Sequence, residues 1–470
     1  MTAVLKRPPP PRECSLTSRD RSLAEPLAEH EVRVRRRNRS KLSDLSYRNP
    51  NHHTLPHVVK FSGGRSSAAM TFLLAEQGIL NPQRGDVVLF ANTSAEHPGT
   101  YEFTAECKRR LEQEFSLPVF WYEFCTVEDA SRGIYRRRRS YRLVKPVPIE
   151  EDPDGYRSNG EVFEEMLSFQ GMLPNPHSRS CTSKLKLHPG HSLLSEWLGN
   201  TDGPAHDGHH RGESYINLEE SAETYRRNGG TASPKDYITQ KQYMMSMPTA
   251  RPKQLWQDFT ETPIESNTEK RGTACQATPQ TAIQATRQTA VRASLFGFGP
   301  VHFVTLLGLR ADEPRRVNRV LSRTLFAEGA GSGKCQISNQ PPGEHPYFPL
   351  FESGYSARDI KDFWGAADFD LDIPDWAGNC VFCFMKGTES LRDAGQAADE
   401  RRIANSPSDI SWWSEIERRY RREIPSTRGE GISKFGFFGV SGPSFAQVAA
   451  LNDTKATRYS HGTPACDCTD

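Results

Sequence analysis

The sequence has little that would place the protein in a membrane, outside the cell, or on nucleic acid by overall charge. Its 470 residues contain no apolar run near the ~20 residues that a spanning helix needs, so no membrane partner is expected. The basic, proline-containing N-terminus is not followed by an apolar stretch, so we expect no secretory signal and a cytoplasmic location. Lys and Arg total 60 against 58 Asp and Glu, so any basic binding surface must be local.

Apolar residues are also scarce. They make up 36% of the chain, which is low for a fully packed globular protein, so part of the length is expected to lie outside the core. The chain has 10 cysteines. Without export they are expected to be core residues, metal ligands or nucleophiles before disulfides.

Three segments show little core potential. Residues 1–54 carry a proline run and a basic stretch, and predict a disordered arm. Residues 201–295 are polar and repetitive, and predict a long low-complexity insertion. Residues 426–470 predict a polar C-terminal tail. The folded parts are then expected over 55–200 and 296–425, the second of which contains a CxxC pair.

Between these segments, predicted strands alternate with predicted helices. The strands are the apolar runs at residues 57–61, 86–92 and 117–124, and stretches with helical spacing separate them. Residues 301–310 predict a further buried strand, followed by a helix. This alternation predicts a doubly wound α/β domain with a mainly parallel sheet.

A glycine turn follows the first predicted strand and opens a helix. Glycine lets the backbone approach a phosphate, the amide N–H groups point inward, and the helix N-terminus adds partial positive charge. Serine hydroxyls and an arginine add further donors. The turn therefore predicts a phosphate-binding site made of Ser62, Gly63, Gly64, Arg65, Ser66 and Ser67.

The turn, SGGRSS, resembles the SGGxxS signature of the PP-loop (adenine nucleotide α-hydrolase) superfamily. Further segments resemble its phosphoadenosine phosphosulfate reductase-like branch and follow the family's order. They are FANTSAEHPGTYEF (90–103), RSCTSKLKLHP (179–189), LGLRADEPRR (307–316), and YFPLFESGYSARDIKDFW (347–364) with the following CVFC. The resemblance implies an adenine nucleotide α-hydrolase-like fold over roughly residues 57–200 and 300–390.

The resemblance also implies roles for single residues. The glycine turn would hold the nucleotide phosphates, and Asn92, Thr93 and Glu96 would lie beside the adenosine or the loop over it. Positive charge for catalysis would come from Arg310 and from Lys184 or Lys186. Asp312 and Glu313 would orient that charge.

The expected ligand is ATP or an adenylyl sulfate-type nucleotide. In the favoured interpretation, ATP is cleaved between its α- and β-phosphates with Mg²⁺, and an acceptor oxygen is adenylylated. Two alternatives stay open. One is a thiol-dependent sulfonucleotide reductase, and the other is a non-catalytic nucleotide sensor in a nucleic-acid-modifying or defence complex.

The cysteines predict a metal centre. Cys380 and Cys383 have a spacing suited to zinc or an iron–sulfur cluster. Cys181 lies where the reductase-like branch has its upstream cluster cysteines, often as a pair. Cys335 or a tail cysteine would supply a fourth ligand. An all-thiolate set favours a [4Fe–4S] cluster, with zinc as the alternative.

A run of four arginines, Arg136–Arg139, lies between tyrosines. It is a candidate contact for a nucleic acid or a partner protein. A solvated surface run is the simpler interpretation.

Overall fold

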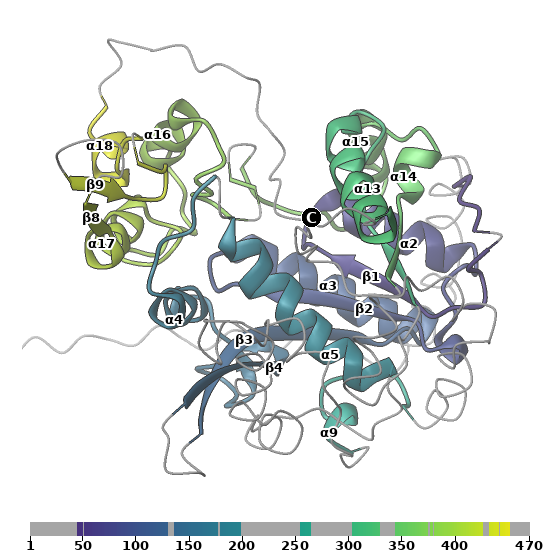
Figure 1. Ribbon diagram of the computed structural model, residues 1–470. Helices are drawn as coiled ribbons and strands as arrows, with labels where there is room; N and C mark the ends of the chain where they lie inside the picture. Colours follow the sequence, from purple (N-terminus) through teal and green to yellow (C-terminus); the bar gives the residue numbers. More distant parts are fainter. Residues whose placement is uncertain are drawn as a thin grey trace, which may run out of the picture.

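The computed structural model describes residues 45–49, 51–129, 136–176, 179–198, 254–264, 303–329, 344–374, 377–378, 380–425, 432–440 and 442–451. A large sheet with helices on both faces forms one part, and a smaller lobe lies beside it (Figure 1).

The sheet has seven strands, in the order β5-β4-β3-β2-β1-β6-β7. They are β1 (His57–Phe61), β2 (Val87–Asn92), β3 (Val119–Asp129), β4 (Arg136–Pro148), β5 (Gly155–Tyr156), β6 (Phe303–Leu306) and β7 (Glu344–Tyr347). β3, β2, β1, β6 and β7 run parallel, and β4 is antiparallel to β3. The expectation of an α/β fold with a mainly parallel sheet is therefore confirmed.

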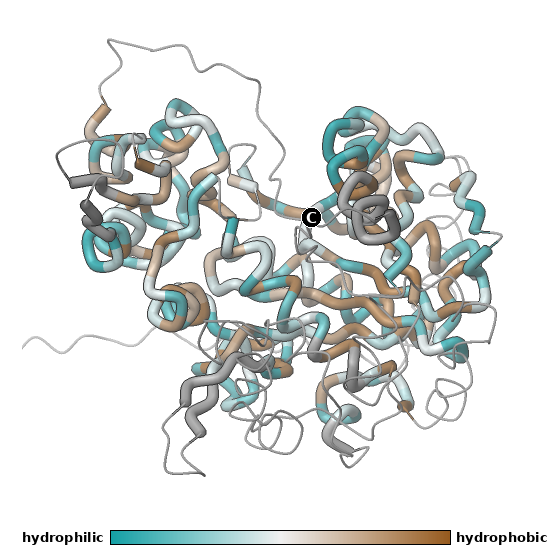
Figure 2. The backbone as a smooth tube through the Cα atoms, viewed as in Figure 1, coloured by the Kyte–Doolittle hydropathy of each residue, from teal (hydrophilic) through white to brown (hydrophobic). Residues whose placement is uncertain are grey.

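Helices cover both faces of the sheet because successive strand residues point to opposite sides. Val59 and Phe61 of β1 pack with α2 (Arg65–Glu76), α3 (Pro98–Phe115) and α15 (Ala357–Gly365). Val58 packs on the other face with α5 (His188–Leu198). In Figure 2 the strands form an apolar centre between these layers. The strand order reverses between β1 and β6, and ligands of open α/β sheets bind at such a switch point.

The smaller lobe has its own apolar core. Trp413, Phe437 and Phe445 pack there with Phe163 and with Val381 beside the CxxC pair. The lobe is built from α4 (Glu161–Gln170), α16 (Thr388–Gln396), α17 (Ile410–Tyr420), α18 (Phe445–Ala449), β8 (Arg422–Pro425) and β9 (Ile432–Phe435). The remaining elements are η1 (Pro82–Arg84), η2 (Thr182–Leu187), α9 (Gln254–Gln257), α13 (Pro314–Gly329) and α14 (Pro349–Glu352). None of the helices in the described ranges combines the length and apolar character that a membrane crossing requires.

Both expected terminal segments contain residues that belong to the folded core. Leu45 and Tyr47 are buried in the main core, although the arm was expected to extend to residue 54. Phe437, Phe445 and Val448 are buried in the smaller lobe, within the expected tail. In both segments a few apolar residues, separated by polar ones, pack on a core that other elements form. Such isolated residues give no helical or strand periodicity in the sequence.

The expectation of a low-complexity insertion over 201–295 is wrong for residues 254–264. Trp256, Phe259 and Ile264 are buried against the α5 face of the sheet. Glu112 of α3 accepts hydrogen bonds from the Thr260 hydroxyl (2.6 Å) and the buried Lys108 ammonium (2.5 Å). The buried Trp256 ring and the hydrogen bond from Thr260 to Glu112 therefore hold this segment in place. The segment is too short to show a hydrophobic periodicity in the sequence. The rest of the expected insertion lies outside the described residues.

Replacing Trp256 with alanine is expected to lower the free energy of unfolding by about 3–5 kcal/mol, the usual cost of removing a buried aromatic ring. The ring lies 5.2 Å from that of Phe120 and 5.3 Å from that of Trp197, centroid to centroid. Urea unfolding measures the effect, and Asp258→Asn at an exposed neighbouring position is the control, expected to stay within about 0.5 kcal/mol. Equal stability of the two variants would show that the segment does not dock.

Stability is expected to depend on pH through His57. Burial lowers the pKa of His57 to about 4, and the ring lies between the Leu55 carbonyl (2.8 Å) and the Tyr47 hydroxyl (3.2 Å). The unfolded chain therefore takes up this proton near its ordinary pKa of about 6.5, before the folded chain does. The stabilisation is complete above pH ~6.5 and is lost as the pH falls toward ~4, by at most about 3 kcal/mol.

The check is urea unfolding between pH 4 and 7, with His57→Gln as the matched variant. The variant keeps a side chain that can hydrogen bond but does not titrate. Its stability should fall less steeply than that of the wild type across this window. Parallel curves for the two proteins would contradict the assignment.

Candidate functional site

The glycine turn lies at the carboxyl end of β1 and leads directly into α2. Its hydroxyls are tied to one another: Ser67 Oγ lies 3.0 Å from Ser62 Oγ and donates to the Gly64 carbonyl at 3.0 Å. The Ser62 amide donates to Ser67 Oγ at 3.2 Å. The turn is therefore a pre-formed loop at a helix N-terminus, the arrangement that favours an anion.

Glycine is required at two points of close approach. Gly63 has a φ of +78°, and a Cβ there would lie 2.9 Å from atoms of Phe90 and Thr100. Gly308, just after β6, passes so close that a Cβ would lie 2.7 Å from the Ser67 Cα. The sequence patterns do not single out Gly308, although it stands in the LGLR segment at the end of the strand predicted over residues 301–310.

Arg310 reaches the loop from a part of the chain 244 positions away. Its guanidinium donates to Ser66 Oγ at 2.9 Å and to Asp312 Oδ1 at 2.9 Å. Glu313 accepts from the Arg310 amide at 3.0 Å, and its other carboxylate oxygen lies 3.5 Å from the guanidinium. The structure thus brings together four residues that the sequence assigned to one site.

Arg65 is placed differently from the rest of the turn. Its guanidinium donates twice to the carboxylate of Asp370, at 2.7 and 2.9 Å. Its backbone carbonyl accepts from the buried Trp364 indole at 2.9 Å. These contacts join the start of α2 to the α15 region, and the Arg65 guanidinium forms a half-exposed ion pair with Asp370.

Asn92, Thr93 and Glu96 form a buried network at the end of β2. Asn92 Nδ2 donates to Glu123 Oε1 (2.8 Å), and its Oδ1 accepts from the Ser94 amide (2.8 Å). Glu96 accepts from the Thr93 hydroxyl at 2.8 Å and from the Ala95 amide at 3.1 Å. Burial raises the pKa of Glu123. The three expected site residues therefore shape the loop beside the turn through contacts with protein groups.

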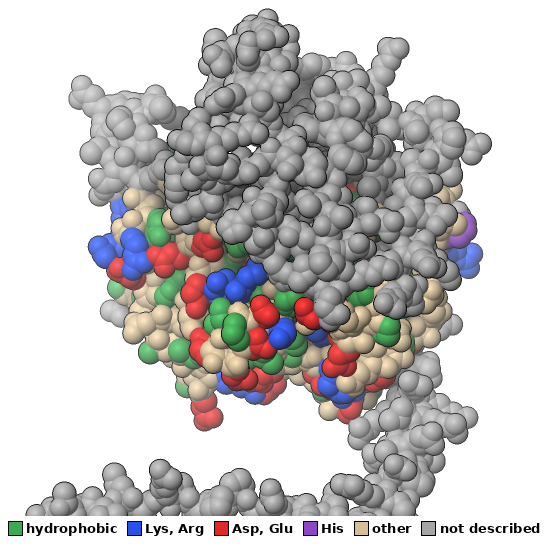
Figure 3. Space-filling view, turned by 90° about the horizontal axis from the view of Figure 1, so that it is seen from below, with side chains coloured by type: hydrophobic (Ala, Val, Ile, Leu, Met, Phe, Trp, Pro, Cys, Tyr) green, Lys and Arg blue, Asp and Glu red, His purple; other side chains and the backbone are tan. Residues whose placement is uncertain are grey.

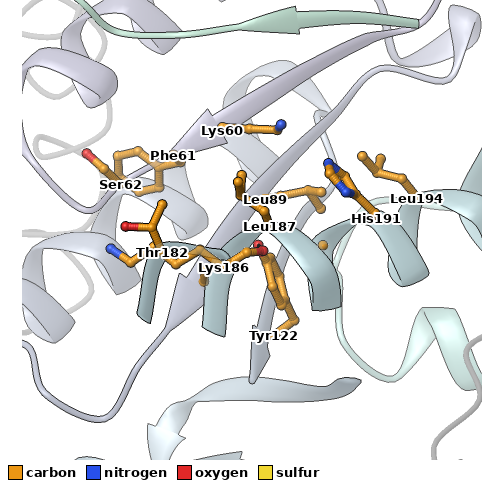
Figure 4. Close-up of a pocket in the computed structure, with 12 residues that line it drawn as sticks. Lys60, Phe61, Ser62, Leu89, Tyr122, Thr182, Lys186, Leu187, His191 and Leu194 are labelled. Carbon is orange, nitrogen blue, oxygen red and sulfur yellow. Dashed lines mark hydrogen bonds between the residues drawn. The ribbon is translucent and has the colours of Figure 1, made fainter. Parts of the chain in front are cut away.

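A pocket opens between the end of β1 and the helical segment formed by η2 and α5 (Figure 4). Ser62 and Thr182 lie at one end of it, and His191 and Leu194 at the other. Lys186 extends along one wall toward Ser62. The lining residues are Lys60, Phe61, Ser62, Leu89, Ala91, Tyr122, Thr182, Lys186, Leu187, Gly190, His191 and Leu194. An apolar cleft with a few charged groups, here beside the glycine turn, is typical of a small-molecule site.

Of the two candidate lysines, Lys186 lines this pocket. Lys184 lies on the same turn of η2 but is not among the lining residues.

Three of the candidate metal ligands, Cys181, Cys380 and Cys383, lie within the described residues. Cys181 and Cys380 pack against the core of the smaller lobe. Cys383 is buried. Burial raises the pKa of Cys181, while the Lys186 charge acts in the opposite direction. Among the described residues, no three His, Cys, Asp or Glu side chains gather closely enough to hold a metal ion. Cys335 and the tail cysteines lie outside the described residues, so the metal centre stays a prediction.

Arg136–Arg139 lie on β4, paired antiparallel with the end of β3. Their side chains are not among those described. On the described part of the face in Figure 3, acidic and basic side chains are interspersed. A contact to nucleic acid through this run therefore stays a prediction.

Fold and site together define an α/β protein whose mainly parallel sheet carries a glycine turn at its switch point. The chain is 31% identical over 174 residues to the uncharacterized nin region protein ORF290 of Escherichia phage lambda. The match covers 36% of this chain and 51% of that protein, so the chain spans about half the length of the curated relative it matches. No family model matches the chain, and no solved structure matches it.

Proposed function

We propose that the protein is a PP-loop enzyme that binds ATP and cleaves it to AMP and pyrophosphate while adenylylating an acceptor. The observation that carries this proposal is the contact of Arg310 with Ser66 of the glycine turn, at 2.9 Å. It supports a site where turn amides and a fixed guanidinium meet the same phosphates. The strand order and the turn at the sheet's switch point support an adenine nucleotide α-hydrolase-like fold.

In the proposed reaction, an acceptor oxygen attacks the α-phosphorus. The bond from that phosphorus to the oxygen bridging the α- and β-phosphates breaks, and pyrophosphate leaves with the bonding electrons. Arg310 and the N-terminus of α2 would stabilise the negative charge that develops on the phosphates. Holding Arg310 with Asp312 and Glu313 fixes the guanidinium before the substrate arrives, which is how preorganised charge accelerates such steps.

Asp312 and Glu313, which contact Arg310 beside the glycine turn, are suited to a magnesium ion that arrives with the nucleotide. Mg²⁺ commonly binds through one or two carboxylates together with substrate phosphates and water. Asp312 and Glu313 lie beside Arg310, and no three-ligand cluster occurs in the described ranges. When bound, the ion would neutralise charge on the phosphates, while the protein groups orient them.

A second candidate, thiol-dependent reduction of a sulfonucleotide, is supported by the position of Cys380. Its backbone pairs with that of Glu96 in an isolated antiparallel bridge, which brings the CxxC segment to the loop after β2. A thiol in this segment would thus lie next to the proposed nucleotide site.

Product analysis separates the two reactions. Protein purified without oxygen is incubated with ATP and Mg²⁺, or with an adenylyl sulfate and a dithiol reductant. Release of pyrophosphate and AMP from ATP supports the first proposal. Release of sulfite from the sulfonucleotide, with ATP left intact, would replace it by the second.

A further inference from the structure

The helical segment that carries Lys186 is not a regular α-helix. From Thr182 to Leu187 it is a π-helix, and the His188 amide donates to the Ser183 carbonyl five residues earlier. π-turns are rare and are frequently found at functional sites. Such a turn needs contacts from outside the helix to persist.

Tyr122 of β3 provides such a contact. Its hydroxyl donates to the Lys186 carbonyl at 2.7 Å. The side chain is buried in the core beneath α5, and burial raises the pKa of the phenol, so it stays a neutral donor. Gly190 makes room for this contact, because a Cβ there would lie 2.7 Å from the Tyr122 hydroxyl oxygen.

The register of this turn determines where Lys186 points. One residue more or less per turn rotates the following positions by about 100° around the helix axis. In the π-register, Lys186 lines the pocket and extends toward Ser62 (Figure 4). In an α-register, the same side chain would leave the pocket wall.

We propose that Tyr122 is a positioning residue: by holding the Lys186 carbonyl it maintains the π-turn and keeps the Lys186 ammonium at the phosphate end of the pocket. This inference rests on the proposed function and adds to it a polyphosphate contact made by Lys186 of η2, a different part of the chain from Arg310. The bound group that Lys186 meets is the polyphosphate of the nucleotide.

A double-mutant cycle tests the coupling. Lys186→Met and Tyr122→Phe are each expected to weaken binding of α,β-methylene-ATP with Mg²⁺ by about 10-fold, as for a charged contact worth ~1.4 kcal/mol. The double variant should bind about as weakly as either single variant, because both changes remove the same contact. Additive losses, near 100-fold, would overturn the proposal.

Two further variants separate positioning from general destabilisation. Gly190→Ala displaces the Tyr122 hydroxyl and should reproduce the Tyr122→Phe effect. Tyr47→Phe also removes a buried, hydrogen-bonded hydroxyl, but outside the pocket, and should leave the affinity unchanged. A loss of affinity in Tyr47→Phe equal to that in Tyr122→Phe would contradict a specific role.

Hydrogen exchange tests, without any nucleotide, whether Tyr122 stabilises the π-turn. In Tyr122→Phe, amides of the peptide 182–190 should exchange at least ~10-fold faster than in the wild type, because the turn loses its external hydrogen bond. Unchanged exchange would overturn the proposal. If the wild type binds no nucleotide but exchange rises as expected, the proposed function fails while the role of Tyr122 in the π-turn stands.

Discussion

Gly63→Val is expected to weaken ATP binding by at least ~100-fold, equivalent to ~2.8 kcal/mol. Two effects add. The φ of +78° is strained for a residue with a Cβ, and the Cβ would press on Phe90 and Thr100 at 2.9 Å. If the backbone shifts to relieve the contact with Phe90 or Thr100, the amides of the turn no longer point at a common phosphate position. Calorimetric titration with α,β-methylene-ATP and Mg²⁺ measures the loss.

The matched control is Gly78→Val. Gly78 also has a positive φ, +67°, but nothing lies within 4 Å of the Cβ position, and it follows α2 at the end remote from the turn. It should lower stability in urea through backbone strain and leave nucleotide affinity within about 2-fold. Equal affinities of the Gly63 and Gly78 variants would contradict a phosphate site at the turn.

Arg310→Met is expected to lower the rate of pyrophosphate release by about 10²–10³-fold, the usual cost of removing a preorganised donor to developing charge. Methionine retains much of the side-chain volume but removes the hydrogen bonds to Ser66 and Asp312. The rate constant kcat should fall more than KM rises, because charge on the phosphates grows toward the transition state.

Arg315→Met provides the comparison. Arg315 is exposed at the start of α13, five positions after Arg310, so its removal changes the net charge by the same amount. It should leave kcat within about 2-fold if the effect of Arg310 arises from contact rather than from long-range charge. A similar loss in both variants would count against the assigned role of Arg310.

The sequence predicts the parallel sheet because β1, β2 and β3 are short apolar runs separated by helical spacing. It also predicts the turn, since Gly63 and Gly64 stand between a strand and a helix. Arg310 could be assigned only through the family resemblance, and its 2.9 Å contact with Ser66 depends on a pairing of β1 with β6 that spans the chain. Local patterns carry no information about such a pairing.

Three further features, Tyr122, the π-turn and the docked Trp256, could not be predicted from sequence patterns. Tyr122 stands in an apolar strand run, and its hydroxyl distinguishes it only once Gly190 and the Lys186 carbonyl are seen beside it. The π-turn leaves no mark in residue spacing, because Thr182–Leu187 is compatible with an ordinary helix. Trp256 is a single aromatic residue in a polar region, too short for periodicity.

The smaller lobe shows the same limit. Phe437 and Phe445 lie in a glycine-rich stretch that predicts a tail, yet they pack on Trp413 with ring centroids 5.4 and 5.6 Å away. Aromatic residues bury large areas individually, so a few of them can fix a chain that has no regular pattern. The average composition of such a stretch is polar, so it does not reveal that one or two aromatic residues anchor the chain.

The most direct test of a nucleotide site at the glycine turn is a titration of the wild type with α,β-methylene-ATP in the presence of Mg²⁺, beside Gly63→Val and Gly78→Val. One nucleotide per chain is expected to bind to the wild type and to the Gly78 variant, and binding to the Gly63 variant is expected to be at least ~100-fold weaker. No binding to the wild type, or equal binding to all three proteins, would contradict it.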